Sequence, residues 1–240
     1  MIPLKDDNPT EIRPIVTITL IVLATLVFLY QLSLGKLGQA FVYQYGAIPA
    51  ALFRSASLPP ELAALPPSFT LLSSMFLHGG IMHLVGNMLY LWIFGNNVED
   101  AMGHGRFVAF YVVCGIAAAL THAAIDPGSQ IPMIGASGAI SGVLGAYLLL
   151  YPRAMVLVLI PLGFFTRMIY IPAGFVLGFW FLLQILSGGA SRGRGGGGVA
   201  WFAHVGGFAA GMLLIGLFKR RSVRFFNPPH SHPRRTTSRW

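Results

Sequence analysis

The chain has 240 residues, of which 55% are hydrophobic and only 10% charged, and its mean hydropathy is +0.70. Soluble domains carry about 25% charged residues, so this composition excludes a soluble globular protein and indicates a polytopic membrane protein. The formal charge of +9 does not indicate a nucleic-acid partner, because four of the cations (219–221 and 224) directly follow an apolar run, as cations facing anionic lipid do.

Six apolar segments approach the roughly 20 residues that cross a bilayer. They cover residues 14–34, 81–98, 106–125, 137–152, 169–187 and 199–218. The first is longer than a signal-peptide core and no small-residue cleavage site follows it, so we expect it to be retained. Cys114 is the only cysteine, so an internal disulfide is excluded. The expected fold is an all-α membrane domain of six transmembrane helices over residues 14–218.

The segments between these runs have their own character. Residues 35–80 form a long first loop whose five prolines break any span, so short amphipathic pieces in the membrane interface are expected. Residues 156–166 are apolar but interrupted by Pro161 and Gly163, and we interpret them as an interfacial connector. Residues 187–198 have the composition of a flexible linker, and the basic tail 219–240 is expected to be disordered from Ser222 onward.

The distribution of Lys and Arg predicts the orientation. With six spans both termini share one side, and that side holds twelve cations against four on the other. The twelve are Lys5, Arg13, Arg106, Arg153, Arg167 and the seven cations after Phe218; the four are Lys36, Arg54, Arg192 and Arg194. The positive-inside rule therefore places residues 1–13 and the tail in the cytoplasm.

Four polar side chains inside the spans invite a functional interpretation, because polar groups are costly there. They are His83, Asn87, Ser137 and His204. His83 and Ser137 each lie 16 residues before the first charged residue at the inner end of their span, and His204 lies 15 before it. At 1.5 Å per residue this is roughly 23 Å of a core roughly 30 Å thick. Three segments thus place two histidines and a serine at one depth, near the outer surface.

Small residues beside the two central polar groups predict close helix packing. Gly138, Gly142 and Gly145 follow Ser137, while Gly207 and Gly211 follow His204. Such patterns let helix backbones approach, as a hydrogen bond between Ser137 and His204 would require.

The remaining two polar residues predict an oxyanion site. His83 and Asn87 are four residues apart, share a helix face and can both donate hydrogen bonds. The Ser137 amide, at a helix start, can add a third donor.

Each of these residues also has a structural interpretation. Ser137 alone would be read as a packing residue, His204 as a buried hydrogen-bonded histidine and Asn87 as a residue that joins helices. His78 fits an interfacial position, and His104 and His122 fit structural or solvated ones. The shared depth of Ser137 and His204 favours catalysis over these separate explanations.

Other chemistries fit less well. No H-E-x-x-H motif occurs, and the predicted spans contain no Asp or Glu for an aspartyl mechanism or a proton pump. A metal site built from His78, His83 and His204 stays open, although it lacks a thiolate or carboxylate ligand. No cofactor is expected.

The residues resemble those of the rhomboid intramembrane serine proteases. "HGGIMHLVGNMLYLWIFG" is similar to their second-helix motif, "GASG" to their nucleophile motif, and "AHVGGFAAG" to their sixth-helix motif. The resemblance covers roughly residues 14–218. It implies a Ser137–His204 dyad, with His83, Asn87 and the Ser137 amide stabilising the oxyanion. It also implies that Gly135 belongs to the motif before the nucleophile.

Two features depart from the family pattern. Ser141 stands where many members carry an aromatic residue against the histidine, so the sequence does not indicate what orients His204. Residues 35–80 contain no tryptophan, although many members have a Trp-Arg pair in this loop.

The expected function is an intramembrane serine endopeptidase in a bacterial cell membrane. It would cleave single-span membrane proteins near the outer end of their transmembrane helix. The resemblance implies substrates with helix-weakening Gly or Pro near the cut and a small residue before it. The alternatives are a catalytically silent protein that binds membrane proteins, and a small channel or transporter.

Overall fold

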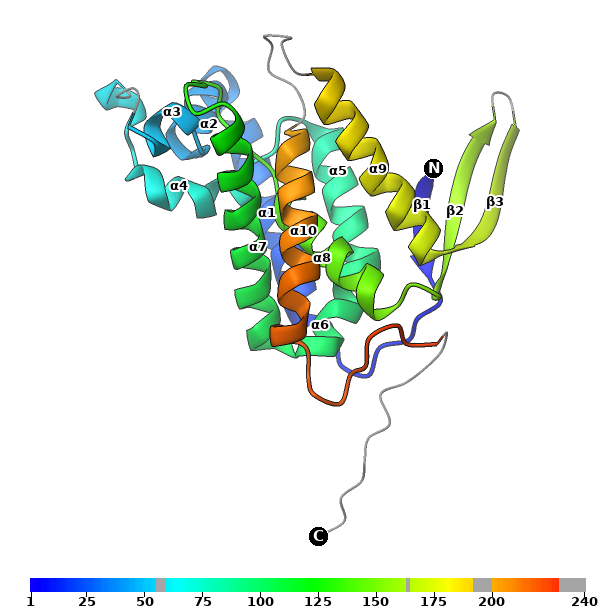
Figure 1. Ribbon diagram of the computed structural model, residues 1–240. Helices are drawn as coiled ribbons and strands as arrows, with labels where there is room; N and C mark the ends of the chain where they lie inside the picture. Colours follow the sequence, from blue (N-terminus) through cyan, green and yellow to red (C-terminus); the bar gives the residue numbers. More distant parts are fainter. Residues whose placement is uncertain (55–58, 163–164, 192–199, 229–240) are drawn as a thin grey trace.

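The computed structural model describes residues 1–54, 59–162, 165–191 and 200–228, and it consists mainly of helices with a small sheet at one side (Figure 1). Among the described residues, four helices are long and apolar enough to cross a membrane: α1 (Ile15–Ser33), α7 (His104–Ile125), α9 (Ala173–Ser191) and α10 (Trp201–Phe218). A fifth span results if segments 60–76 and 81–102, bent by 82° relative to each other, count as one.

The predicted second span is a helix of three parts. It comprises α5 (Ile81–Tyr90), a π-helical turn (Leu91–Gly95) and α6 (Asn96–Met102). The predicted fourth span is α8 (Ser137–Leu150), an apolar helix of only 14 residues. The six predicted spans therefore become four or five by length and hydropathy.

The loop 35–80 folds into short helices that lie together beside one end of α7, at the upper left of Figure 1. These are α2 (Gly38–Tyr45), α3 (Pro49–Leu52), α4 (Pro67–Ser73) and 3-10 turns at Gly35–Leu37, Pro60–Leu62 and Ser74–Phe76. Proline has a fixed φ and no N–H, which suits the first position of a helix. Pro49, Pro60 and Pro67 each occupy such a start. The residues that exclude a span are thus the ones that begin the short helices.

A three-stranded antiparallel sheet corrects the expectation of an all-α chain. Its strands are β1 (Ile2–Asp6), β2 (Met155–Leu162) and β3 (Phe165–Pro172), in the order β1-β2-β3. Met155 pairs with Pro172 and Leu162 with Phe165, so β2 and β3 form a regular hairpin. The sequence of the two strands is mostly apolar and rich in β-branched residues, which favour strands. The predicted connector is therefore a hairpin, and the predicted fifth span starts only at Ala173.

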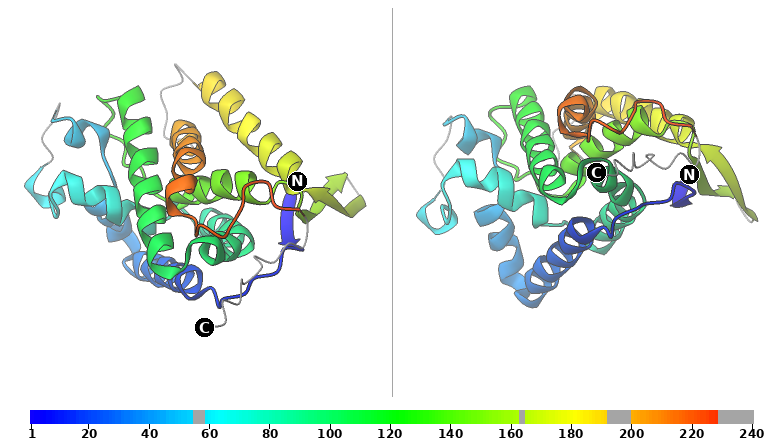
Figure 2. Two further views of the ribbon diagram at one scale, coloured as in Figure 1. Left: turned by 60° about the horizontal axis from the view of Figure 1, so that its bottom comes forward. Right: turned by 90° about the horizontal axis from the view of Figure 1, so that it is seen from below.

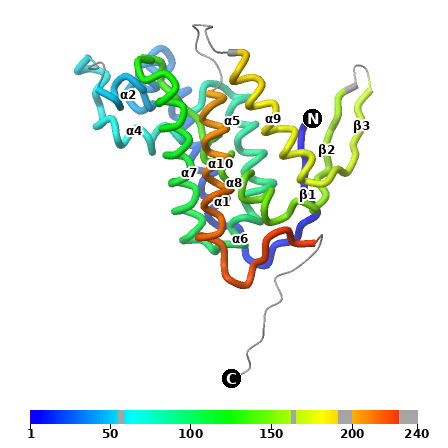
Figure 3. The backbone as a smooth tube through the Cα atoms, in the orientation of Figure 1, coloured from blue at the N-terminus to red at the C-terminus, as the bar shows by residue number. Residues whose placement is uncertain are grey.

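Part of the predicted tail packs on the helices. The Arg220 amide donates to the Ala101 carbonyl at 2.8 Å, and the Phe226 amide donates to the Leu149 carbonyl at 2.8 Å. Val223, which lies between Arg220 and Phe226 in the sequence, is buried. The prediction of disorder is thus wrong for residues 222–228, whose path is traced in Figure 3, and residues 229–240 lie outside the described part. Of the predicted linker, residues 187–191 continue α9, and residues 192–199 lie outside the described part.

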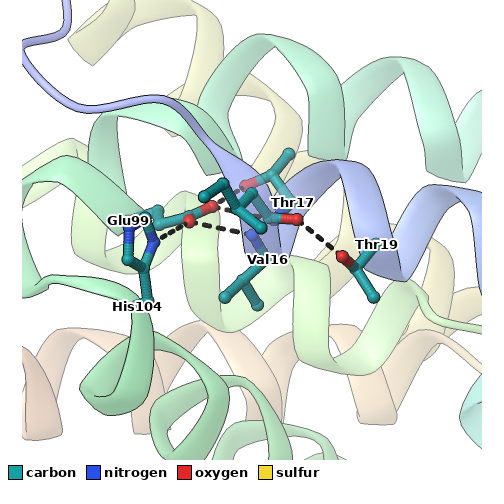
Figure 4. Close-up of polar contacts among 6 residues, drawn as sticks. Val16, Thr17, Thr19, Glu99 and His104 are labelled. Carbon is teal, nitrogen blue, oxygen red and sulfur yellow. Dashed lines mark hydrogen bonds and ion pairs between the residues drawn. The ribbon is translucent and has the colours of Figure 1, made fainter.

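A buried carboxylate ties the start of α1 to the end of α6 (Figure 4). Glu99 has no exposed surface and accepts hydrogen bonds from the Val16 and Thr17 amides at 2.9 and 2.8 Å and from Thr17 Oγ1 at 2.7 Å. His104 Nδ1 lies 2.6 Å from Glu99 Oε1, the oxygen that also accepts from the Val16 amide. First-turn amides have no partner within their own helix, and a negative charge there is favourable. Glu99 therefore caps α1, and His104 has the structural role expected of it.

Helix α8 lies inside the bundle and contacts α5, α6, α7, α9 and α10 (Figure 2). Eleven of its 14 residues are buried, including Leu144, Tyr147 and Leu150, which have no exposed surface. A helix surrounded by protein is apolar on every side, which explains why the α8 sequence has no polar face. The residue that begins this enclosed helix is Ser137.

Candidate active site

Ser137 and His204 form a hydrogen-bonded pair. Ser137 is the first residue of α8, and His204 lies in the first turns of α10. His204 Nε2 is 2.8 Å from Ser137 Oγ, and the histidine side chain is buried. The two side chains that the sequence places at one depth are therefore in direct contact, in the geometry of a nucleophile and its base.

Backbone contact between α8 and α10 permits this pairing. A Cβ added at Gly207 would collide with the Gly138 carbonyl oxygen, and one at Gly211 would collide with the Gly142 carbonyl oxygen. Both positions must be glycine for the helices to lie this close. Direct contact between the backbones of α8 and α10 thus sets the distance between Ser137 and His204.

The other ring nitrogen of His204 also has a partner. Gln184 Oε1, on α9, lies 2.7 Å from His204 Nδ1, and both side chains are buried. Trp180 and Trp201 flank the imidazole with ring centroids at 5.8 and 6.2 Å. Ser141, by contrast, donates to the Ser137 carbonyl at 2.6 Å within its own helix.

Sequence reasoning missed Gln184, although a signal was present. It is a polar residue within an apolar span, which is the same criterion that selected His83, Asn87, Ser137 and His204. Its position relative to His204 depends on how α9 packs against α10, and this packing has no sequence signature of its own.

His83 and Asn87 lie against the backbone just before Ser137. A Cβ built at Gly135 would be 2.8 Å from His83 Nε2 and 3.6 Å from Asn87 Nδ2. Gly135 has a φ of +120°, which side chains rarely adopt, and its amide donates to the Ser74 carbonyl at 2.9 Å. Glycine at this position therefore leaves room for both side chains beside the nucleophile.

Both side chains offer donors near Ser137. The Gly79 amide donates to His83 Nδ1 at 3.3 Å, so the ring proton of neutral His83 is on Nε2, the atom nearest Gly135. Asn87 Nδ2 is buried and has no hydrogen-bond partner among the described residues. The Ser137 amide, at the start of α8, has no acceptor within its own helix. The two side-chain donors thus lie beside Gly135, two residues before Ser137.

His78 contacts His83 but, within the described residues, makes no hydrogen bond or ring contact with Ser137 or His204. His78 is fully buried, with Nδ1 3.3 Å from the Phe76 carbonyl oxygen and its ring 5.2 Å from that of His83. In the described part of the chain, no group of three or more His, Cys, Asp or Glu side chains could hold a metal ion. The structure therefore gives no support to the alternative of a histidine metal site.

A separate cavity of about 470 Å³ lies between α1 and α5 and contains none of these residues. Its lining is Ile21, Thr25, Leu84, Val85, Met88, Leu89 and Trp92. These α5 residues occupy a different helix face from His83 and Asn87.

Fold and site together define an integral membrane protein with a hydrogen-bonded Ser–His pair, whose histidine is buried. The sequence profile of the Rhomboid domain matches residues 67–221, more than half of the chain, and the chain belongs to the rhomboid family. This result supports the resemblance that the three sequence motifs indicate.

Relatives come from a bacterium, a plant and yeast, and the yeast relative is a mitochondrial protein. Rhomboid protease GluP of Bacillus subtilis (strain 168) is 41% identical over 106 residues, which are 39% of this chain and 20% of the relative. RHOMBOID-like protein 5 of Arabidopsis thaliana is 40% identical over 78 residues (32% and 25%), and Rhomboid protein 1, mitochondrial, of Saccharomyces cerevisiae is 30% identical over 148 residues (60% and 40%). The chain covers less than half the length of each.

Proposed function

We propose that the chain is an intramembrane serine endopeptidase with Ser137 as nucleophile and His204 as general base. The observation that carries this proposal is the 2.8 Å contact between Ser137 Oγ and His204 Nε2. Membership of the rhomboid family and the likeness to Rhomboid protease GluP support it.

The reaction follows from the positions of these groups. His204 Nε2 takes the proton of Ser137 as Oγ bonds to the scissile carbonyl carbon. His83, Asn87 and the Ser137 amide stabilise the oxyanion that forms. His204 then gives its proton to the leaving amine, and a water molecule, activated in the same way, releases the acyl group.

The proposed substrate class rests on the resemblance to rhomboid proteases and on the hydrogen bonding of helices in a membrane. Peptide carbonyls in a transmembrane helix are already hydrogen-bonded, so the helix must unwind locally before attack. We therefore propose single-span membrane proteins as substrates, cut near the outer end of their helix, at sites with Gly or Pro nearby and a small residue before the cut.

The proposed membrane arrangement has six crossings, with α8 as the short fourth one. A helix enclosed by protein can begin below the membrane surface, because irregular backbone is tolerated where protein covers it. Contacts at one end of the bundle support termini on a shared side. The Glu11 amide donates to Asp100 at 3.0 Å, and the Arg220 amide reaches Ala101 next to it.

The excess of cations at that end favours the cytoplasm for residues 1–13 and for the basic tail, with anionic lipid beside the tail. We propose a bacterial cell membrane, with the active site opening to the outer side.

The test is incubation of the purified protein with a single-span substrate that carries a Gly-containing helix, comparing wild type with Ser137→Ala. Cleavage by wild type alone supports the proposal. Cleavage by both would assign the activity to a contaminant. Absence of cleavage together with absence of labelling by a fluorophosphonate probe would favour a silent membrane-protein-binding relative, and ion or solute flux that survives Ser137→Ala would favour a channel.

A further inference from the structure

Gln184 holds its side-chain amide in one orientation. Its Nε2 donates to the Trp180 carbonyl at 3.1 Å, one turn earlier on α9, and its Oε1 lies 2.7 Å from His204 Nδ1. Turning the amide by 180° would place its oxygen against the Trp180 carbonyl oxygen, two acceptors facing each other with no proton between them. The observed orientation is thus the one that satisfies both contacts.

The orientation of Gln184 determines which nitrogen of His204 carries the proton. Because Oε1 can only accept, Nδ1 must donate. In the neutral imidazole, Nε2 is then unprotonated, and it is the atom 2.8 Å from Ser137 Oγ. A general base must be unprotonated at the atom that faces the nucleophile.

We infer that Gln184 is a positioning residue that holds His204 in the tautomer able to accept the proton of Ser137, so that the site is a Ser–His–Gln arrangement rather than a dyad. This inference rests on the proposed protease function. Gln184 acts through His204 and does not touch the reacting atoms.

The other neighbours of the ring cannot supply this selection. Trp180 and Trp201 restrict the tilt of the imidazole by packing, but their ring contacts do not distinguish Nδ1 from Nε2. Ser141, at the position where the family pattern has an aromatic residue, is occupied by its bond to the Ser137 carbonyl. Among these groups, the described structure gives Nδ1 a hydrogen-bond acceptor only in Gln184.

A neutral amide suits a base inside a membrane domain. The carboxylate of a Ser-His-Asp triad fixes the tautomer and also stabilises the imidazolium. A carboxylate in this buried place would have to be desolvated, which is costly in a low-dielectric surrounding. Glutamine supplies the same acceptor geometry without a net charge, and its oxygen dipole still favours the Nδ1 proton when His204 becomes positively charged.

The experiment compares Gln184→Met, which keeps the length of the side chain without an acceptor, with Leu183→Met as control. Leu183 is the adjacent α9 residue and is exposed on the outside of the bundle. We expect kcat of Gln184→Met to fall about 10- to 100-fold with KM nearly unchanged, a part of the 10²–10⁴-fold that general base catalysis supplies. Leu183→Met should match wild type. If Gln184→Met does not fold, Gln184→Asn takes its place, since its shorter side chain withdraws the oxygen.

A second measurement does not depend on proteolysis. ¹⁵N NMR of histidine-labelled protein, with the His204 signals assigned by their loss in His204→Ala, should show a proton on Nδ1 in wild type and a mixture of tautomers in Gln184→Met. If Gln184→Met has the kcat of the wild type, or if its His204 tautomer is unchanged, the inference about Gln184 is overturned. The proposed function still stands in that case, provided that the wild type cleaves the substrate. A wild type that cleaves nothing but shows the Nδ1 proton would overturn the function alone.

Discussion

The two ends of the helix bundle bury polar groups in different ways. At the Glu99 cap both carboxylate oxygens are used, one by Thr17 and the other by Val16 and His104. At the Ser137 end, the buried Asn87 amide nitrogen has no partner among the described residues. Buried polar groups are normally satisfied, and an exception calls for an explanation. The comparison teaches that Glu99 holds helices together with both its oxygens, whereas Asn87 keeps a free donor beside the proposed nucleophile. An unsatisfied atom alone does not mark a site, since Asn97 Oδ1 and Asp100 Oδ1, close to Glu99 in the sequence, are also buried without a partner among the described residues.

The largest expected effect concerns Ser137 and His204. Ser137→Ala, His204→Ala and the double variant should each lose at least about 10⁴-fold in kcat, and the losses should not add, because nucleophile and base act as a unit. Steady-state cleavage of a single-span substrate measures this, with thermal unfolding in detergent as a check on the fold. Independent, multiplicative losses would contradict the pairing.

Next comes the cap at the other end. Glu99→Ala leaves two helix-terminal amides and the Thr17 hydroxyl without their acceptor, and it should lower the free energy of unfolding by about 3–5 kcal/mol. Glu99→Gln, which keeps one acceptor oxygen, should lose less. Thermal unfolding of the purified variants gives the ranking. Equal stability of Glu99→Ala and wild type would show that the cap does not hold α1.

Asn87, the proposed oxyanion donor, should affect catalysis rather than stability. Asn87→Ala removes one of three donors, so kcat should fall about 10²-fold or less. The unfolding temperature should stay unchanged, since the amide nitrogen makes no hydrogen bond within the described residues. A variant with wild-type kcat, or one that is mainly unstable, would place Asn87 with the structural polar groups instead.

The smallest expected effect is a pH dependence of stability at Asp6, in β1. Burial raises the pKa of Asp6 from 3.8 to about 6, even though Tyr147 donates a hydrogen bond to its carboxylate at 2.6 Å. The folded state therefore favours protonated Asp6. Its contribution is fully present below pH 3.8 and is lost as the pH rises through about 6.

Asp6→Asn tests this directly. The wild type should lose about 1–2 kcal/mol of stability between pH 4 and 7 from this group, allowing for partial water access. The variant should lack that loss. Unfolding midpoints at the two pH values measure the difference. Parallel pH profiles for wild type and variant would contradict the expected role of Asp6.

Local pattern was sufficient to select Ser137 and His204, which the structure brings into contact. Counting residues back from the first charge beyond each span predicts one level for His83, Ser137 and His204 without knowledge of how their helices pack. Glycine spacing identifies which faces of α8 and α10 can touch.

The failures of prediction involve contacts between distant parts of the chain. The run 155–172 is mostly apolar on both sides of Thr166 and Arg167, and a short apolar run does not distinguish a strand from a buried helix. It becomes a sheet partly because β1, more than 140 residues earlier, pairs with it. Likewise, the role of Gln184 depends on its contact with His204 in the next helix, and residues 219–228 are held by contacts with Ala101, Leu149 and Leu150.

The contact of main chain with main chain along α8 and α10 has a consequence for how freely the protein can change. Side chains in the core, such as Leu144 and Phe208, fill volume around this contact but do not set the spacing of the two backbones. Volume-conserving replacements of such side chains are generally well tolerated. Many different apolar residues should therefore be acceptable at these positions with little effect on catalysis. Gly145, Gly207 and Gly211 have no such latitude, because a Cβ at any of them would collide with the backbone of the facing helix. A Cβ at Gly138 or Gly142 would instead collide with Ala118 or Cys114 of α7. Variation among active forms of this protein should therefore be abundant in its largest core residues and absent from its smallest.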